Sequence, residues 1–147
     1  MKCKMLAVAV LLMTLVCSVF SIGCSPKGTV SASVVFAEEQ MVVIKVDSVN
    51  GESTLMQVME KLKNDGDIVY EESQGMITSI NGKAGETISA TEGYSWFLYT
   101  SDEEFSLNEW GTVEYDGQIY GSAAMGASTL KVAAGEYYIW YLNKWSY

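Results

Sequence analysis

One stretch of this 147-residue chain has the apolar spacing of an α-helix; it begins at Thr54 and ends near Lys63. Thr54 and Gln57 are spaced as in a capping box, and Gly66 is placed to end the helix. The apolar residues recur at i, i+3, i+4 and i+7 and so share one helical face: Leu55, Val58, Met59 and Leu62. Because this is the one clear helix, the rest of the domain must build its core from β-structure, and we expect an α+β fold.

Most of the remaining apolar runs have the composition of β-strands. Residues 41–46, Met-Val-Val-Ile-Lys-Val, are too continuously apolar to alternate, so we expect this strand to be buried on both faces. Asn81-Gly82 and Asp116-Gly117 are typical of two-residue hairpin turns. We expect one helix packed on a mixed or antiparallel sheet, with strands over 67–72, 76–80, 94–100 and 136–142 and a hairpin over 112–120.

The amino-terminal segment has the pattern of a secretory signal peptide. Lys2 and Lys4 precede the 18 uncharged residues 5–22, and the small residue Gly23 and then Cys24 follow. This arrangement resembles the lipobox of bacterial lipoproteins, in which the cysteine is diacylated and becomes the new N-terminus. The resemblance implies lipid attachment at Cys24 and an extracytoplasmic, membrane-anchored lipoprotein.

This boundary divides the chain into three segments. We expect a signal peptide at 1–23, a tether at 24–40, to which residues 34–36 could add an edge strand, and a domain at 41–147. Two alternatives stay open for the export signal. Cleavage after Ala37 would release a secreted protein, and the uncharged run is near the lower length limit for an uncleaved membrane anchor. All three place the globular part outside the cytoplasm.

The expected mature chain is acidic and has a single cysteine. Cys3 and Cys17 lie in the expected signal peptide, so Cys24 alone remains and no disulfide can form within one chain. Seven lysines and all 18 acidic residues follow Cys24, which gives a net charge of 7 − 18 = −11 without arginine or histidine. Such a chain repels phosphate backbones and anionic lipid. We therefore expect no nucleic-acid partner, and attachment to the membrane through the lipid alone.

The residues required for common catalytic and metal sites are missing or isolated. The absence of histidine excludes Ser-His and Cys-His nucleophile pairs. Residues 128–131, Ser-Thr-Leu-Lys, match the Ser-x-x-Lys of penicillin-recognising enzymes, but the partner motifs of those enzymes are not in the sequence. The acidic clusters at 64–67 and 102–104 lack the EF-hand spacing. We expect no catalytic site, no metal site and no required cofactor.

Four short motifs follow one another across almost the whole expected domain. They are Gly51-Glu-Ser-Thr-Leu55, Gly75-Met-Ile-Thr-Ser-Ile-Asn-Gly82, Trp96-Phe-Leu-Tyr99 and Gly135-Glu-Tyr-Tyr-Ile-Trp140. In this order they resemble the transcobalamin-like C-terminal domain, a small module of cobalamin carriers and of many bacterial surface proteins. The resemblance implies a β-grasp-like fold and a corrinoid as the candidate ligand. Vertebrate carriers hold the corrinoid against a large helical domain, for which this sequence has no counterpart, so the resemblance supports the fold better than the ligand.

Aromatic residues are the remaining candidates for a binding surface. In a period-2 strand, Trp96 lies on one face and Phe97 and Tyr99 on the other, so one set fills the core and the other could line a ligand surface. Trp96 and Tyr120 are the candidate ligand-binding residues for a corrinoid or another small ring ligand, with packing in the core as the alternative for both. We expect an exported, lipid-anchored, non-catalytic binding domain. The alternative is a cell-surface module that binds a partner protein or a polysaccharide and takes no small molecule.

Overall fold

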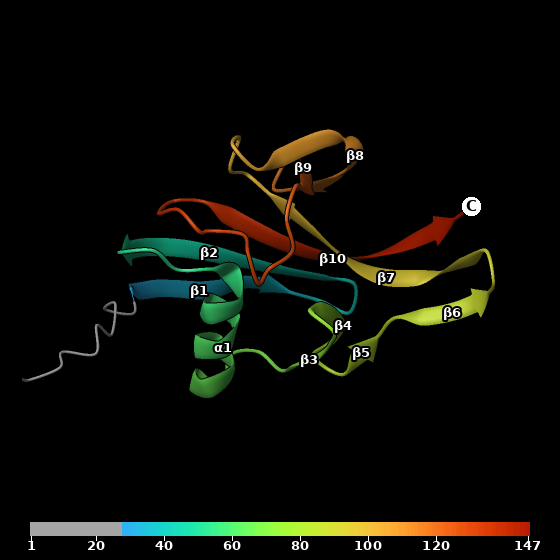
Figure 1. Ribbon diagram of the computed structural model, residues 1–147, viewed down its shortest axis with the longest axis horizontal. Helices are drawn as coiled ribbons and strands as arrows, with labels where there is room; N and C mark the ends of the chain where they lie inside the picture. Colours follow the sequence, from blue (N-terminus) through green and yellow to red (C-terminus); the bar gives the residue numbers. More distant parts are fainter. Residues whose placement is uncertain (1–27) are drawn as a thin grey trace, which may run out of the picture.

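The computed structural model describes residues 28–147, and the expected signal peptide and the lipid site at Cys24 lie outside these residues. The described chain is mostly antiparallel β-structure with a single helix, which confirms the α+β class (Figure 1). In this part of the chain, no helix is long and apolar enough to cross a membrane. The elements are β1 (Thr29–Ala37), β2 (Met41–Asn50), α1 (Leu55–Asp65), β3 (Tyr70–Ser73), β4 (Met76–Ile80), β5 (Lys83–Ala84), β6 (Glu86–Ser89), β7 (Glu92–Thr100), β8 (Ser106–Tyr115), β9 (Gln118–Ala123) and β10 (Tyr137–Ser146).

A seven-stranded sheet forms the body of the domain. Its strands follow the order β1-β2-β10-β7-β9-β8, and β6 pairs with the first part of β7. A second sheet, β3-β4-β5, lies on the same side of the large sheet as α1 (Figure 1). All pairings between the described strands are antiparallel. Of the two sheet types expected, the antiparallel one is therefore observed.

Strand β1 lies within the segment expected to be a tether. It pairs with β2 from Thr29 to Ala37 and includes residues 34–36, the possible edge strand of the sequence pattern. Val30 and Val34 pack against the core on the helix side. The sheet therefore begins at Thr29, before the boundary expected at residue 41. Residues 31–33, Ser-Ala-Ser, have short side chains that suit a half-buried edge strand as well as a tether, so composition does not distinguish the two.

The helix forms as its sequence pattern predicts. The Thr54 hydroxyl accepts a hydrogen bond from the Gln57 backbone N–H, and the Gln57 side chain accepts one from the Thr54 N–H, which completes the capping box. Gly66 ends the helix with a φ of 87°, a left-handed conformation that glycine adopts readily. The predicted apolar face is confirmed, because its four residues are fully buried: Leu55, Val58, Met59 and Leu62.

The two predicted hairpin turns are also confirmed. Asn81 and Gly82 have φ values of 49° and 80°, and Asp116 and Gly117 have φ values of 51° and 73°. Two successive residues with positive φ characterise the type I′ turn, whose twist matches that of the flanking strands. A third turn of this kind, at residues 74–75, joins β3 to β4.

The large sheet has a core on each face. Val42 and Ile44 pack on the helix side and Val43 on the other, so β2 is buried on both faces as predicted. On the second face, the rings of Phe36 in β1 and Tyr115 in β8 are 5.6 Å apart, although four strands separate β1 from β8 in the sheet order. The sheet therefore curls away from α1, and the β8–β9 hairpin lies over its second face (Figure 1).

Candidate functional site

An open groove runs between the small sheet, the middle of β7 and the loop after β9. It has a volume of ≈ 810 Å³, and we call it the β7 groove. A second hollow, of ≈ 420 Å³, lies between the β1–β2 and β4–β5 turns and has no aromatic residue in its lining. The β7 groove is the better candidate for a binding site because its lining is rich in aromatic residues: residues 75–78, 85–87, 94–98 and 122–127, with Trp110, Trp140, Trp145 and Tyr147.

The β7 groove exists because the middle of β7 lacks a partner strand along one edge. On this edge, β6 pairs with residues 92–94, and β9 pairs with Tyr99 and Thr100. On the opposite edge, β10 pairs with β7 along the whole of residues 92–100. Within the described sheets, residues 95–98 therefore have a strand on one side only, and their open edge faces the groove.

The backbone of Trp96 points toward this open edge. The Thr91 carbonyl accepts a hydrogen bond from the Tyr147 N–H, and the Ser101 N–H donates one to the Tyr137 carbonyl. Both bonds involve odd-numbered residues, just before and just after β7. Because the register between β7 and β10 is unbroken, the odd-numbered residues of β7 direct their backbone groups to β10. Successive residues of a strand direct their N–H and C=O to opposite edges. The register thus leaves the Trp96 N–H and C=O without a strand partner in the described part of the chain.

The side chains around the open edge are mostly apolar, and several are exposed. Met76 and Trp110 are each 65% exposed, and Met125 is 46% exposed. Glu86 is the one charged residue among the described lining residues. Exposed large apolar side chains gathered around a hollow are typical of a binding surface.

The C-terminal residues form one wall of the β7 groove. The Trp145 indole N–H donates to the Ser95 hydroxyl at 3.0 Å, and the Trp145 ring lies 5.4 Å from that of Tyr147. The indole can pack here because residue 93 is glycine; a Cβ at this position would lie 2.5 Å from the Trp145 ring. The Tyr147 side chain is 96% exposed, so it can contact a ligand at the rim of the groove.

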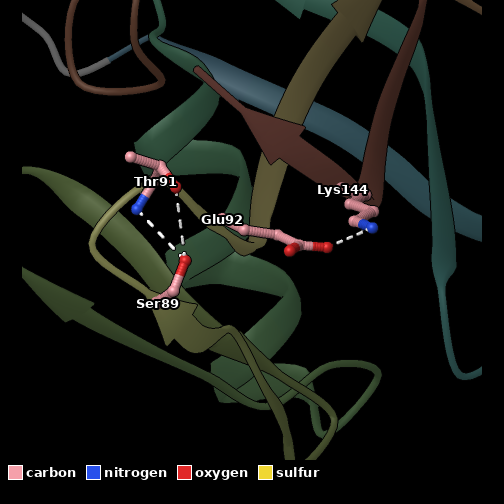
Figure 2. Close-up of polar contacts among 4 residues, drawn as sticks. All are labelled: Ser89, Thr91, Glu92 and Lys144. Carbon is pink, nitrogen blue, oxygen red and sulfur yellow. Dashed lines mark hydrogen bonds and ion pairs between the residues drawn. The ribbon is translucent and has the colours of Figure 1, made fainter.

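Polar contacts hold the β6–β7 turn, which lies at the Trp145 end of β7. Figure 2 shows the Ser89 hydroxyl accepting a hydrogen bond from the Thr91 N–H at 3.2 Å and Glu92 paired with Lys144 of β10. The hydrogen bond from Lys144 to Glu92, with the charge of this carboxylate, raises the pKa of Lys144. An exposed ion pair of this kind contributes little stability, and the unbroken β7–β10 ladder sets the register of the two strands.

One buried side-chain donor in the described lining has no acceptor. Trp140 is 5% exposed and pairs with Leu98 across the β7–β10 ladder. Its Nε1–H has no hydrogen-bond partner among the described residues. By contrast, the Trp96 Nε1–H donates to the Lys83 carbonyl at 2.9 Å. An unpaired buried donor costs about 1–3 kcal/mol, so an acceptor brought to Trp140 would be favourable.

The two predicted ligand residues lie on opposite faces of the large sheet. Trp96 lines the β7 groove, yet it is 7% exposed and packs in the core on the helix side. Tyr120 is also 7% exposed, and its ring packs 6.3 Å from that of Tyr137 on the second face, where burial raises the pKa of Tyr120. Gly121, beside Tyr120, faces strand β8: a Cβ there would lie 3.1 Å from the Asn108 backbone nitrogen. The structure thus brings Trp96 to the candidate site and places Tyr120 away from it.

Several lining residues were not singled out from the sequence. Trp110 and Tyr147 supply exposed rings, Trp145 supplies a half-buried one, and Met76 and Met125 supply flexible apolar cover. The available signal was the density of aromatic residues toward the C-terminus, where Trp145 and Tyr147 are spaced to share one strand face. Which of these rings surround a groove depends on the strand order, which the spacing does not reveal.

Residues 128–131, with the Ser-x-x-Lys pattern, lie in the loop before β10. The Leu130 N–H donates to the Gly126 carbonyl, and Lys131 pairs with Glu52 at 2.8 Å. This contact with Lys131 lowers the pKa of Glu52. The pattern therefore connects the loop to the start of α1. Among residues 28–147, no group of three or more His, Cys, Asp or Glu side chains is arranged to hold a metal ion.

Comparisons of the chain with protein-family models, curated protein sequences and solved structures found no match. The resemblance to the transcobalamin-like C-terminal domain therefore rests on the sequence motifs alone. The function is inferred from the chemistry of the β7 groove.

Proposed function

We propose that this chain is an exported, lipid-anchored, non-catalytic binding domain that holds a partner protein in the β7 groove. The observation that carries the proposal is an apolar hollow of ≈ 810 Å³ that opens onto an unpaired stretch of strand. Sites that bind an extended peptide segment combine apolar pockets for its side chains with main-chain groups that bond its backbone. Here Met76 and Trp110 supply apolar surface, and the Trp96 backbone supplies the polar groups.

A lipid on Cys24 would suit this role, because it would hold the domain close to a membrane with the groove still accessible. Five residues of chain lead from Cys24 to Thr29, and they span at most about 18 Å. The start of β1 and the C-terminal residues of the groove wall lie at opposite ends of the domain (Figure 1). The groove wall formed by the C-terminal residues would therefore lie far from the point of attachment.

A photo-crosslinking phenylalanine analogue at position 110 should capture a partner protein in cells of the source organism. Trp110 is 65% exposed in the β7 groove, so an aromatic replacement keeps the fold and reaches whatever enters. The control is the same analogue at position 119, where Ile119 is 71% exposed on β9 outside the groove lining. We expect one defined adduct from position 110 and none from position 119. Equal capture at both positions would contradict the proposed site.

A small ring ligand, with a corrinoid as the first candidate, is the second possible occupant of the β7 groove. The favouring observation is the set of rings in its lining: the exposed Trp110 and Tyr147, and the half-buried Trp145 beside Tyr147. After incubation with cobalamin and removal of free ligand, the protein should keep the absorbance of the corrinoid. Trp110→Ala should reduce the retained absorbance, and Ile119→Ala should not. A protein that retains none would leave the partner-protein proposal standing alone.

We also propose that the fold is β-grasp-like. The packing of α1 across one face of an antiparallel sheet supports this classification, as does the order of the four sequence motifs.

A further inference from the structure

We infer that the β7 groove binds an extended segment of a partner protein, which adds to the open edge of β7 as a further strand. This inference rests on the proposed function, which makes the β7 groove the binding site, and it names the binding mode and the chemistry of the segment. The segment is neutral or basic, extended, and carries side chains that alternate between the two faces of the sheet.

The gap in the pairing of β7 has the length of a short bound strand. Pairing with β6 ends at Tyr94 and pairing with β9 begins at Tyr99. The open residues 95–98 correspond to about 13 Å of strand. A segment in this gap would continue the line of β6 and β9 and bond to the Trp96 N–H and C=O. In strand addition, such main-chain hydrogen bonds supply much of the affinity.

Side chains on both faces of the gap can receive the alternating residues of the segment. Phe97 lines the β7 groove on one face of β7, and Trp96 and Ile77 line it on the helix side. Met76 and Met125 have flexible side chains that can adapt to residues of different size. On the helix side, the unpaired Trp140 Nε1–H could donate to an acceptor of the segment, so the side-chain oxygen of a serine, threonine or asparagine facing it would be favoured.

Charge determines which segments fit. Glu86 is the one charged residue in the described lining, and residues 28–147 carry six lysines and 18 acidic residues, a net charge of 6 − 18 = −12. An acidic segment is therefore repelled, and a basic residue near Glu86 is favoured. A second copy of this chain brings the same negative charge, so a different protein is the better occupant.

The first experiment tests the strand pairing directly. Peptides are selected from a random displayed library against the full-length chain in detergent, and their complexes are followed by amide hydrogen exchange. The bound peptide should slow exchange of the Trp96 amide. Two versions of a selected peptide are then compared, one methylated at its odd-numbered and one at its even-numbered backbone nitrogens. One version should bind at least about tenfold more weakly than the unmethylated peptide, and the other should bind about as well. Equal loss of affinity in the two methylated peptides, or a Trp96 amide whose exchange is not slowed by the peptide, would overturn strand addition.

The second experiment separates this inference from the proposed function on which it rests. Glu86→Lys should weaken a basic selected peptide about threefold at low salt, whereas Glu114→Lys, at an exposed position on β8 outside the groove lining, should not. Peptides that bind but are unaffected by Glu86→Lys and Trp110→Ala would overturn the groove as the site. Cobalamin bound in the groove, or self-association of the chain through it, with no peptide selected would overturn strand addition and keep the groove.

Discussion

Replacing Trp96 by alanine should lower the free energy of unfolding by about 3–5 kcal/mol. Trp96 is 7% exposed and packs in the core on the helix side. Its indole N–H also donates to the Lys83 carbonyl at 2.9 Å. The substitution removes a buried ring, leaves a cavity and takes the donor away from β5. Urea unfolding followed by far-UV circular dichroism measures the loss.

The matched control is Trp110→Ala, which removes the same side chain from an exposed position in the same groove. Trp110 is 65% exposed, so we expect its loss to change the free energy of unfolding by no more than about 0.5 kcal/mol. Trp96→Phe should fall between the two, because it keeps a buried ring but loses the hydrogen bond. If Trp96→Ala costs no more than Trp110→Ala, Trp96 is not a core residue.

Replacing Leu130 by alanine should cost about 2–5 kcal/mol of stability and should also weaken ligand binding in the β7 groove. Leu130 is fully buried although it lies in the loop before β10. Its carbonyl accepts from the Leu55 N–H at the start of α1, and its N–H donates to the Gly126 carbonyl, each at 2.9 Å. Leu130 therefore anchors the loop that carries residues 124–127 of the groove wall. Thermal unfolding and peptide titration measure the two effects.

Lys131→Ala is the control for this loop. Lys131 lies beside Leu130 and pairs with Glu52, and both side chains are mostly exposed. Removing an exposed ion pair should change stability by no more than about 1 kcal/mol and leave ligand affinity unchanged. A Leu130→Ala protein that loses stability but keeps full affinity would show that the groove wall does not depend on this anchor.

Local sequence patterns were sufficient for the helix, for β2 and for the hairpin turns. The capping box of Thr54 and Gln57 and the turn at residues 81–82 depend on residues within a few positions of each other. The alternation along β7 was also sufficient to place Trp96 and Tyr99 on opposite faces. In each case the interacting groups are neighbours in the chain, so their spacing specifies the contact.

Local patterns were not sufficient to predict strand β1 or the burial of Tyr120. The serine and alanine residues of β1 suit an edge strand or a tether, and only pairing with β2 distinguishes them. Tyr120 is buried because the sheet curls and brings the β8–β9 hairpin over the second face, where Tyr120 meets Tyr137. That contact depends on the curvature of the whole sheet.

The sequence by itself determined the α+β class, the buried face of α1 and the two faces of β7, since these follow from short-range periodicity. The tertiary structure alone decided that a groove exists and which residues line it. The open edge at residues 95–98 arises because β6 pairs with only one end of β7 and β9 with the other. An open strand edge and a paired one have the same local sequence, because the difference lies in the register of strands that are distant along the chain.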